Sequence, residues 1–288
     1  MKPPPFEYFA PTDLTQAIDL LSGSDNARIL AGGQSLMAML NMRYVFPDRI
    51  VDLNHISELD FIREHTDAIA IGAMTRQRTL QRSPEIAASL PVIPKALRHV
   101  GHFQTRNRGT LGGSLCQLDP SAELPAIAMA YDATVVAAGP QGHRDIPFAQ
   151  FPVTYMTSAL ALDEVLIAVR FLPWRGKVGT GFSEFSRRHG DFAVAGAIAL
   201  LEGSEQSTIR RASLTLFGIA EAPKRARNVE EMLVGHRPTQ ELIDRASKLC
   251  IAHATLEDAF GSAEYRGYVA AAMASIALRE AIAELERQ

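Results

Sequence analysis

The chain changes its residue pattern once, near residue 175, and no other feature of the sequence constrains the fold as strongly. Before this point, short apolar runs alternate with segments of helical periodicity, as in an α/β region. After it, three apolar runs predict antiparallel strands, and three further segments predict helices. The strands are expected at 182–188, 192–201 and 211–217, and the helices at 229–234, 239–254 and 264–287. This order predicts an α+β protein with a three-stranded antiparallel C-terminal sheet and helices.

A proline- and glycine-containing segment, residues 173–177, is the best candidate for a linker. It predicts a domain over residues 1–176, with subdomains of about 1–55 and 56–176, and a second domain over 177–288. Gly176, Gly179 and Gly181 lie close to this linker, and we expect them to provide flexibility. Within the first domain, one continuous helix is expected over 84–100.

Charge and cysteine content exclude several classes of protein. The 29 Lys and Arg residues nearly balance 32 Asp and Glu, which disfavours nucleic-acid binding because a polyanion requires a basic surface. Two cysteines are too few for an iron–sulfur cluster held by four thiolates, and low cysteine use fits a reducing cytoplasm. The N-terminus lacks the apolar region of a secretory signal, and no apolar run approaches the roughly 18 residues of a membrane span.

Two glycine pairs are the strongest candidates for ligand-binding loops in the sequence. They occur as A-G-G-Q-S-L from residue 31 and T-L-G-G-S-L from residue 110, each expected between a strand and a helix. Backbone without Cβ can approach a ligand closely, successive N–H groups can bind an anion, and the serine hydroxyl adds a donor. A single pair is more often an ordinary turn or bulge, whereas two similar pairs favour a dinucleotide whose phosphates both loops hold. Neither pair has the G-x-G-x-x-G or Walker A spacing.

Four other segments accompany the glycine pairs: D-R-I-V-D-L at 48–53, I-G-A-M-T at 71–75, D-P-S-A-E-L-P at 119–125 and R-R-H-G-D-F-A at 187–193. In this combination the chain resembles the FAD-binding medium subunit of molybdenum hydroxylases. That family includes aerobic carbon monoxide dehydrogenase, bacterial N-heterocycle dehydrogenases and the flavin domain of xanthine dehydrogenase. The resemblance extends over essentially the whole chain, and it implies that the region before residue 177 is a two-subdomain FAD-binding unit.

The resemblance also implies a set of cofactor-binding residues. The glycine loops would hold the FAD pyrophosphate, Glu123 would lie near the ribose or adenine half, and Leu166 would offer a backbone contact on the adenine side. Val100 and Gly101 would line the cofactor, and Asp191 and Phe192 belong to the segment beside the isoalloxazine. The loop residues are Ala31, Gly32, Gly33, Gln34, Ser35, Leu36, Thr110, Leu111, Gly112, Gly113 and Ser114.

One departure from the family concerns the segment before Arg187. Relatives often have a lysine there, but residues 182–185 are F-S-E-F and contain none. A role for that lysine in fixing the flavin ring therefore does not transfer to this chain. Whether Glu184 compensates for its absence is left open.

The implied function is electron transfer. Such a subunit takes electrons from [2Fe–2S] clusters on a small iron–sulfur subunit and passes them from FAD to an external acceptor. The organic substrate is hydroxylated at a molybdenum–pterin centre on a large subunit, and the three-chain unit is usually doubled into a heterohexamer. Two alternatives stay open: a flavin-free scaffold subunit, and a self-contained flavin oxidase. No catalytic acid–base pair or nucleophile is predicted, so the chemistry is assigned to FAD.

Several other side chains have a structural interpretation beside a functional one. For Glu123, a favourable position at a helix N-terminus has the same weight as ribose binding, and Asp119 is expected to cap that helix. Phe192 fits either a core strand or the isoalloxazine. Cys116 is expected to be a structural thiol because no C-x-x-C partner exists.

Histidines and arginines between the two loops are further candidate ligands. His99 and His102 form an H-x-x-H pattern without a third ligand, so no metal site is predicted. Arg106 and Arg108 could face phosphates, but solvated or interface charges are favoured for both.

Overall fold

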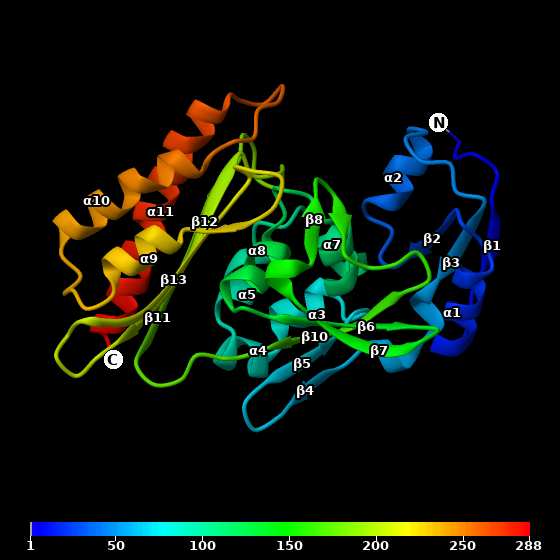
Figure 1. Cartoon of the computed structure of the whole chain (residues 1–288), viewed down its shortest axis with the longest axis horizontal. Helices are drawn as coiled ribbons and strands as arrows, with labels where there is room; N and C mark the ends of the chain where they lie inside the picture. Colours follow the sequence, from blue (N-terminus) through cyan, green and yellow to red (C-terminus); the bar gives the residue numbers. More distant parts are fainter. Residues whose placement is uncertain (1) are drawn as a thin grey trace.

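The computed structural model describes residues 2–288. Its three parts lie in a row along the long axis of the molecule (Figure 1). A small N-terminal subdomain stands at one end, a middle subdomain with its own sheet follows, and the C-terminal sheet with its long helices forms the other end. The predicted α+β architecture, including a C-terminal sheet with helices, is confirmed.

The N-terminal subdomain is a three-stranded parallel sheet of order β1-β3-β2. The carboxylate of Asp13 caps its first helix by accepting the N–H of Gln16 at 2.9 Å. The first glycine loop lies between the second strand and the second helix, as predicted. The elements are β1 (Glu7–Phe9), α1 (Leu14–Ser22), β2 (Ala27–Leu30), α2 (Leu36–Asn41) and β3 (Arg49–Asp52).

The middle subdomain has a five-stranded sheet of order β4-β5-β10-β6-β7, in which all neighbouring strands are antiparallel. Its strands are β4 (Ile62–Glu64), β5 (Ile69–Gly72), β6 (Thr134–Gly139), β7 (Gly142–Pro147) and β10 (Val165–Phe171), and a separate pair is formed by β8 (Pro152–Thr154) and β9 (Thr157–Ser158). Its helices are α3 (Gln77–Arg82), α4 (Pro84–Ser89), α5 (Val92–Ala96), α6 (Phe103–Arg108), α7 (Leu111–Gln117) and α8 (Glu123–Ala130).

The continuous helix expected over 84–100 is wrong. The chain forms two short helices there, α4 and α5, and Leu90 between them has the non-helical angles φ −133° and ψ 59°. Pro91 follows directly and explains the break, because proline has no N–H and disfavours the helical conformation of the residue before it.

The C-terminal domain contains three long antiparallel strands, as predicted, and a two-residue edge strand that the sequence pattern did not indicate. The first strand begins earlier than predicted, at Val178, and ends at Phe185. The second strand begins only at Ala195. Residues 186–194 therefore form a loop. The elements are β11 (Val178–Phe185), β12 (Ala195–Gly203), β13 (Ile209–Phe217), β14 (Lys224–Arg225), α9 (Arg227–Leu233), α10 (Gln240–Leu249), a 3₁₀ turn (Cys250–His253) and α11 (Ala263–Glu286).

Both faces of the C-terminal sheet are buried, which explains the unbroken apolar character of β12. Ile198 and Leu200 point into the core of the middle subdomain, whereas Ala197, Ala199 and Leu201 point into the core under the C-terminal helices. The alternation is that of a strand, whose successive side chains face opposite sides of the sheet. The sheet thereby joins the two domains through a shared core.

Gly179 and Gly181 do not serve as flexible linker residues, contrary to expectation. They lie in β11, where a Cβ on each would stand 1.8 Å and 1.9 Å from the carbonyl oxygens of Ala281 and Ala277. Their function is to let α11 lie directly against the strand. Only Gly176, with φ +85° and open space around it, fits the expectation of a flexible linker residue.

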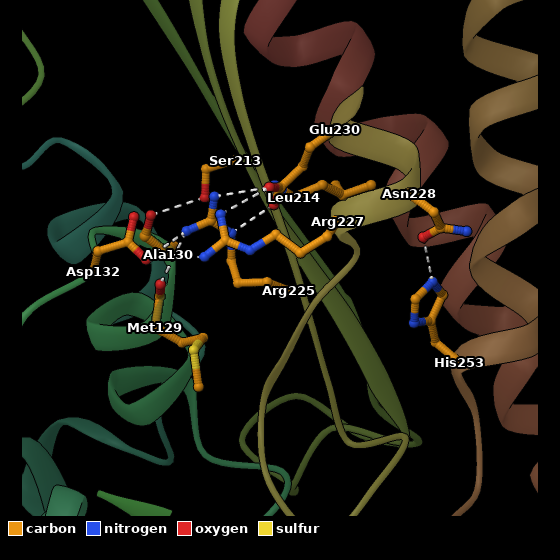
Figure 2. Close-up of polar contacts among 10 residues, drawn as sticks. All are labelled: Met129, Ala130, Asp132, Ser213, Leu214, Arg225, Arg227, Asn228, Glu230 and His253. Atoms are coloured by element: carbon orange, nitrogen blue, oxygen red, sulfur yellow. Dashed lines mark hydrogen bonds and ion pairs between the residues drawn. The ribbon is translucent and has the colours of Figure 1, made fainter. Parts of the chain in front are cut away.

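Polar contacts add to this shared core at its two edges. Lys95 of α5 donates to the carbonyl of Thr180 at 2.8 Å and pairs with Glu280 and Glu284 of α11. At the other edge, Arg225 forms a two-pronged ion pair with Glu230 and reaches Asp132, just beyond α8 (Figure 2). No helix within residues 2–288 is long and apolar enough to cross a membrane.

Arg225→Met should destabilise the C-terminal domain by about 3 kcal/mol, because the buried carboxylate of Glu230 loses its two-point partner and keeps only the exposed Arg227, at 3.3 Å, as a counter-charge. Urea unfolding followed by circular dichroism measures this loss. Arg170→Met is the control, since it removes a pair with Asp145 that is exposed on both sides and should change stability by no more than about 1 kcal/mol. Equal losses in the two variants would contradict the assigned role of Arg225.

Candidate functional site

The first glycine loop offers free hydrogen-bond donors. It connects β2 to α2, with Gly33 at φ +73°. Within residues 2–288, the backbone N–H groups of Gly33, Gln34 and Ser35 have no hydrogen-bond acceptor. Ser35 is exposed and does not use its hydroxyl to cap α2. Consecutive free N–H groups in a tight turn are the arrangement that binds an oxyanion.

The second glycine loop differs from the expected arrangement, because its donors are used within the protein. The N–H of Leu111 donates to Thr75, that of Gly112 to Ala73, and that of Gly113 to the hydroxyl of Thr110, at 3.0, 2.8 and 3.0 Å. The residues form the first turn of α7, and helix α6 precedes them where a strand was expected. This loop therefore supplies close backbone packing rather than a nest of free N–H groups.

The two loops are in direct contact. A Cβ on Gly32 would lie 2.3 Å from the carbonyl oxygen of Arg108 and 2.8 Å from the Cα of Gly109. A Cβ on Gly113 would stand 3.4 Å from that of Ala31. At position 32 only glycine permits this approach, so two segments about eighty residues apart in the sequence form one cradle.

Asn54 and Arg76 hold the cradle together, and no motif in the sequence indicated either residue. The Asn54 amide donates to the carbonyl of Ala31 at 2.8 Å, while Arg76 donates to the Asn54 side chain at 2.6 Å and to the Arg108 carbonyl at 2.5 Å. Burial and the neighbouring Arg108 lower the pKa of Arg76. The only sign in the sequence that either residue could belong to the site is its position, because each follows the end of a strand by a few residues.

A second group of predicted residues lies at the other end of the six-residue helix α6. Arg106 donates to the carbonyls of Val100 and Gly101 at 2.8 and 3.1 Å, so it braces this turn rather than serving as a solvated charge. Gly190, with φ +88°, sits against it: a Cβ there would be 2.9 Å from the ring of His102. The loop that carries Asp191 and Phe192 thus contacts the turn at Val100 and Gly101.

Phe192 is not a core residue, so the interpretation of this side chain as part of a buried strand is wrong. Its side chain is 67 % exposed, and it lies three residues before β12 begins. Asp191 is also exposed, and its N–H donates to Arg188 at 3.1 Å. His99 and His102 have separate contacts, since His99 pairs with Glu184 at 3.3 Å while His102 lies against Gly190.

The remaining predicted residues are Leu166, Asp119 and Glu123. Leu166 lies in β10, and the carbonyl of the next residue, Ile167, accepts from Ala73, which contacts Gly112. Asp119 does not cap α8, contrary to expectation: it accepts from Ser121 at 2.9 Å, and the cap position is Ala122. Glu123 opens α8 and is only 8 % exposed.

Cys116 is a structural thiol by its surroundings, as expected. Burial raises its pKa to about 12, and burial raises that of Cys250 to about 12 as well. Both thiols are therefore neutral near pH 7 and poorly suited to ligate a metal, which requires the thiolate.

A cradle of free N–H groups between two subdomains is an arrangement that can bind the phosphates of a cofactor. Residues 4–174 match the family described as "FAD binding domain in molybdopterin dehydrogenase", and residues 180–281 match "CO dehydrogenase flavoprotein C-terminal domain". The chain belongs to the FAD-binding medium subunits of molybdenum hydroxylases and is an oxidoreductase subunit. The resemblance seen in the sequence is confirmed.

The similarity to individual relatives extends over nearly the full length of the chain. The chain is 37 % identical to the 6-hydroxypseudooxynicotine dehydrogenase complex subunit alpha of Paenarthrobacter nicotinovorans, over 98 % of this chain and 96 % of that one. The carbon monoxide dehydrogenase structure from Hydrogenophaga pseudoflava superposes with a TM-score of 0.95 at 34 % identity, covering 99 % of both chains. Quinoline 2-oxidoreductase from Pseudomonas putida 86 gives a TM-score of 0.93 at 33 % identity, covering 98 % of this chain and 99 % of that one.

Gly33→Ala should weaken the retention of FAD at least tenfold, because a left-handed backbone costs a residue with Cβ roughly 1–2 kcal/mol and the loop would relax away from its donor geometry. FAD binding to the purified chain, measured by fluorescence quenching, tests this. Gly176→Ala is the matched control: its φ of +85° imposes similar strain in open space outside the cradle, so FAD binding should not change. Equal FAD affinity in the two variants would rule out the first loop as a phosphate site.

Proposed function

We propose that this chain binds FAD non-covalently in the glycine cradle and transfers electrons from an iron–sulfur partner to an external acceptor. The observation that carries the proposal is the set of three free backbone N–H groups at Gly33, Gln34 and Ser35, placed against the second loop. Such donors fit a diphosphate, and the guanidinium of Arg76, which is linked through Asn54 to the carbonyl of Ala31, adds positive charge to the cradle.

The cofactor-binding residues divide into two groups in this proposal. The loops from Ala31 to Leu36 and from Thr110 to Ser114 hold the pyrophosphate, with Glu123 and Leu166 on the ribose and adenine side. Val100, Gly101, Asp191 and Phe192 line the isoalloxazine. FAD supplies the redox chemistry when bound, while this chain binds and orients it and keeps one aromatic side chain, Phe192, at the open edge.

The partners follow from the family and from the chemistry that the chain lacks. Its two cysteines are neutral thiols, too few to hold a cluster, so the [2Fe–2S] clusters that deliver electrons belong to a small iron–sulfur subunit. A large subunit carries the molybdenum–pterin centre where the organic substrate is hydroxylated. We infer a cytoplasmic three-chain unit that doubles into a heterohexamer. Within this chain, residues 1–176 form the FAD-binding domain and residues 177–288 the second domain.

Purification of the complex from its native source tests the proposal as a whole. We expect a visible flavin spectrum with one FAD per copy of this chain, two accompanying chains, and iron and molybdenum in metal analysis. A colourless complex with the same chains would instead favour a flavin-free scaffold. Substrate turnover by this chain alone would favour a self-contained flavin oxidase.

Phe192→Ala should leave stability within about 0.5 kcal/mol of the wild type, because the side chain is largely exposed. The rate at which reduced flavin passes electrons to an acceptor should change several-fold, and stopped-flow absorbance measures it. Phe46→Ala, another exposed aromatic in the N-terminal subdomain, is the control and should alter neither quantity. An unchanged rate in the Phe192 variant would remove this residue from the flavin site.

A further inference from the structure

The loop over residues 186–194, which carries Phe192, is closed at its base and anchored at both ends. At the base, the N–H of Val194 donates to the carbonyl of Phe185 at 2.7 Å, where the pairing of β11 with β12 begins. The side chain of Phe192 is 67 % exposed, so its own packing does little to fix its position. The contacts that anchor the loop therefore decide where Phe192 lies.

A buried arginine holds the end of this loop at Val194. Arg266, in the first turn of α11, is only 2 % exposed, and its Nη1 donates to the carbonyls of Val194 and Gly218, each at 2.6 Å. Its Nη2 donates to the carboxylate of Asp258 at 2.6 Å. The three acceptors come from the loop before β12, the turn after β13 and the loop before α11. One guanidinium therefore fixes three separate segments relative to one another.

The carboxylate of Asp258 extends these contacts to the other end of the loop. It accepts the N–H of Phe260 at 2.8 Å and so shapes the turn before α11. The guanidinium of Arg187, the second residue of the loop, donates to the carbonyl of Phe260 at 3.0 Å, and its Cζ lies 5.3 Å from the centre of the Phe260 ring. A continuous set of contacts thus joins Arg266 to both ends of the loop.

Stability alone is a weak reason for burying the charge of Arg266. A buried ion pair loses much of its gain to desolvation, and an apolar side chain of similar size is often as stabilising. The Nε of Arg266 is also buried, without a hydrogen-bond partner within residues 2–288. An apolar side chain could not supply the directional hydrogen bonds that place the two carbonyls and the carboxylate. The buried charge is therefore best explained by the geometry that it imposes.

We propose that Arg266 and Arg187 are positioning residues for electron transfer, which hold the loop over 186–194 at its two ends so that Phe192 keeps one position at the flavin edge. Both act through the loop and not on the cofactor. The loop lies between these anchors against the turn at Gly101, through Gly190. The anchoring concerns the chain alone, whereas its consequence for the flavin rests on the proposed function.

Hydrogen exchange of the purified full chain without FAD tests the anchoring. The amides of Asp191 and Val194 are hydrogen-bonded to Arg188 and Phe185 and report the opening of the loop. Arg187→Met should speed the exchange of the Asp191 amide roughly tenfold, because that end of the loop becomes free to open. Arg266→Met should have the same effect on the Val194 amide.

Arg211→Met is the matched control for Arg187→Met. Arg211 is also an exposed arginine that lies over an aromatic ring, with its Cζ 3.9 Å from the centre of the Trp174 ring, but it is outside the loop. This variant should leave the exchange of both amides unchanged. Unchanged exchange in Arg187→Met would overturn the anchoring. Because Arg187 is exposed, this variant should fold and decides the point even where Arg266→Met does not fold.

Electron transfer in the complex with its partner chains tests the consequence for the flavin. Arg187→Met should change the rate at which reduced flavin passes electrons to an acceptor several-fold, as Phe192→Ala should, while the FAD content stays that of the wild type. In a Phe192→Ala background, Arg187→Met should add no further change, because the side chain that it positions is gone. A merely structural role of Arg187 would instead give independent, additive effects.

The possible outcomes separate this inference from the proposed function. An unchanged rate in Arg187→Met, or additive effects in the double variant, would overturn the positioning role. A complex without FAD would overturn the proposed function and, with it, the consequence for the flavin. The exchange experiment would still decide whether the two arginines anchor the loop.

Discussion

The contact between Gly32 and the backbone of Arg108 and Gly109 is the constraint on which the candidate site depends. Main chain from the N-terminal subdomain lies there against main chain from the middle subdomain, with no room for a side chain between them. Asn54 and Arg76 fasten the contact with hydrogen bonds to the carbonyls on both sides. The free N–H groups of the first loop acquire a defined position only because the second loop holds that contact in place.

The two glycine pairs look alike in the sequence but have different physical roles. The first leaves three successive donors free, whereas the second uses its donors to attach the start of α7 to Thr75 and Ala73. The second loop is therefore the rigid side of the cradle and the first is the side that can bind an anion. Similar local composition does not determine whether an N–H group meets solvent or another part of the chain.

The C-terminal sheet places the other half of the site. Because both of its faces are buried, its strands are fixed relative to the middle subdomain, and the loop over 186–194 is carried against the turn at Gly101. Lys95 and Arg225 secure the two edges of this junction. The same packing buries the side chain of Glu184 against His99, so the surroundings of the turn at Gly101 depend on the way in which the two domains are joined.

Residue patterns alone were enough to predict the α+β class, the C-terminal sheet with its helices and the family, since periodicity and short motifs are local properties. Prediction failed where the outcome depends on neighbours distant in the chain. Asp119 has the sequence context of a helix cap yet bonds to Ser121, and Gly179 and Gly181 look like linker residues yet admit α11. Only the tertiary structure decided which donors stay free, that Asn54 and Arg76 brace the cradle, and that the Glu184 side chain is buried against His99. Contacts and desolvation arise only when segments far apart in the sequence are packed together.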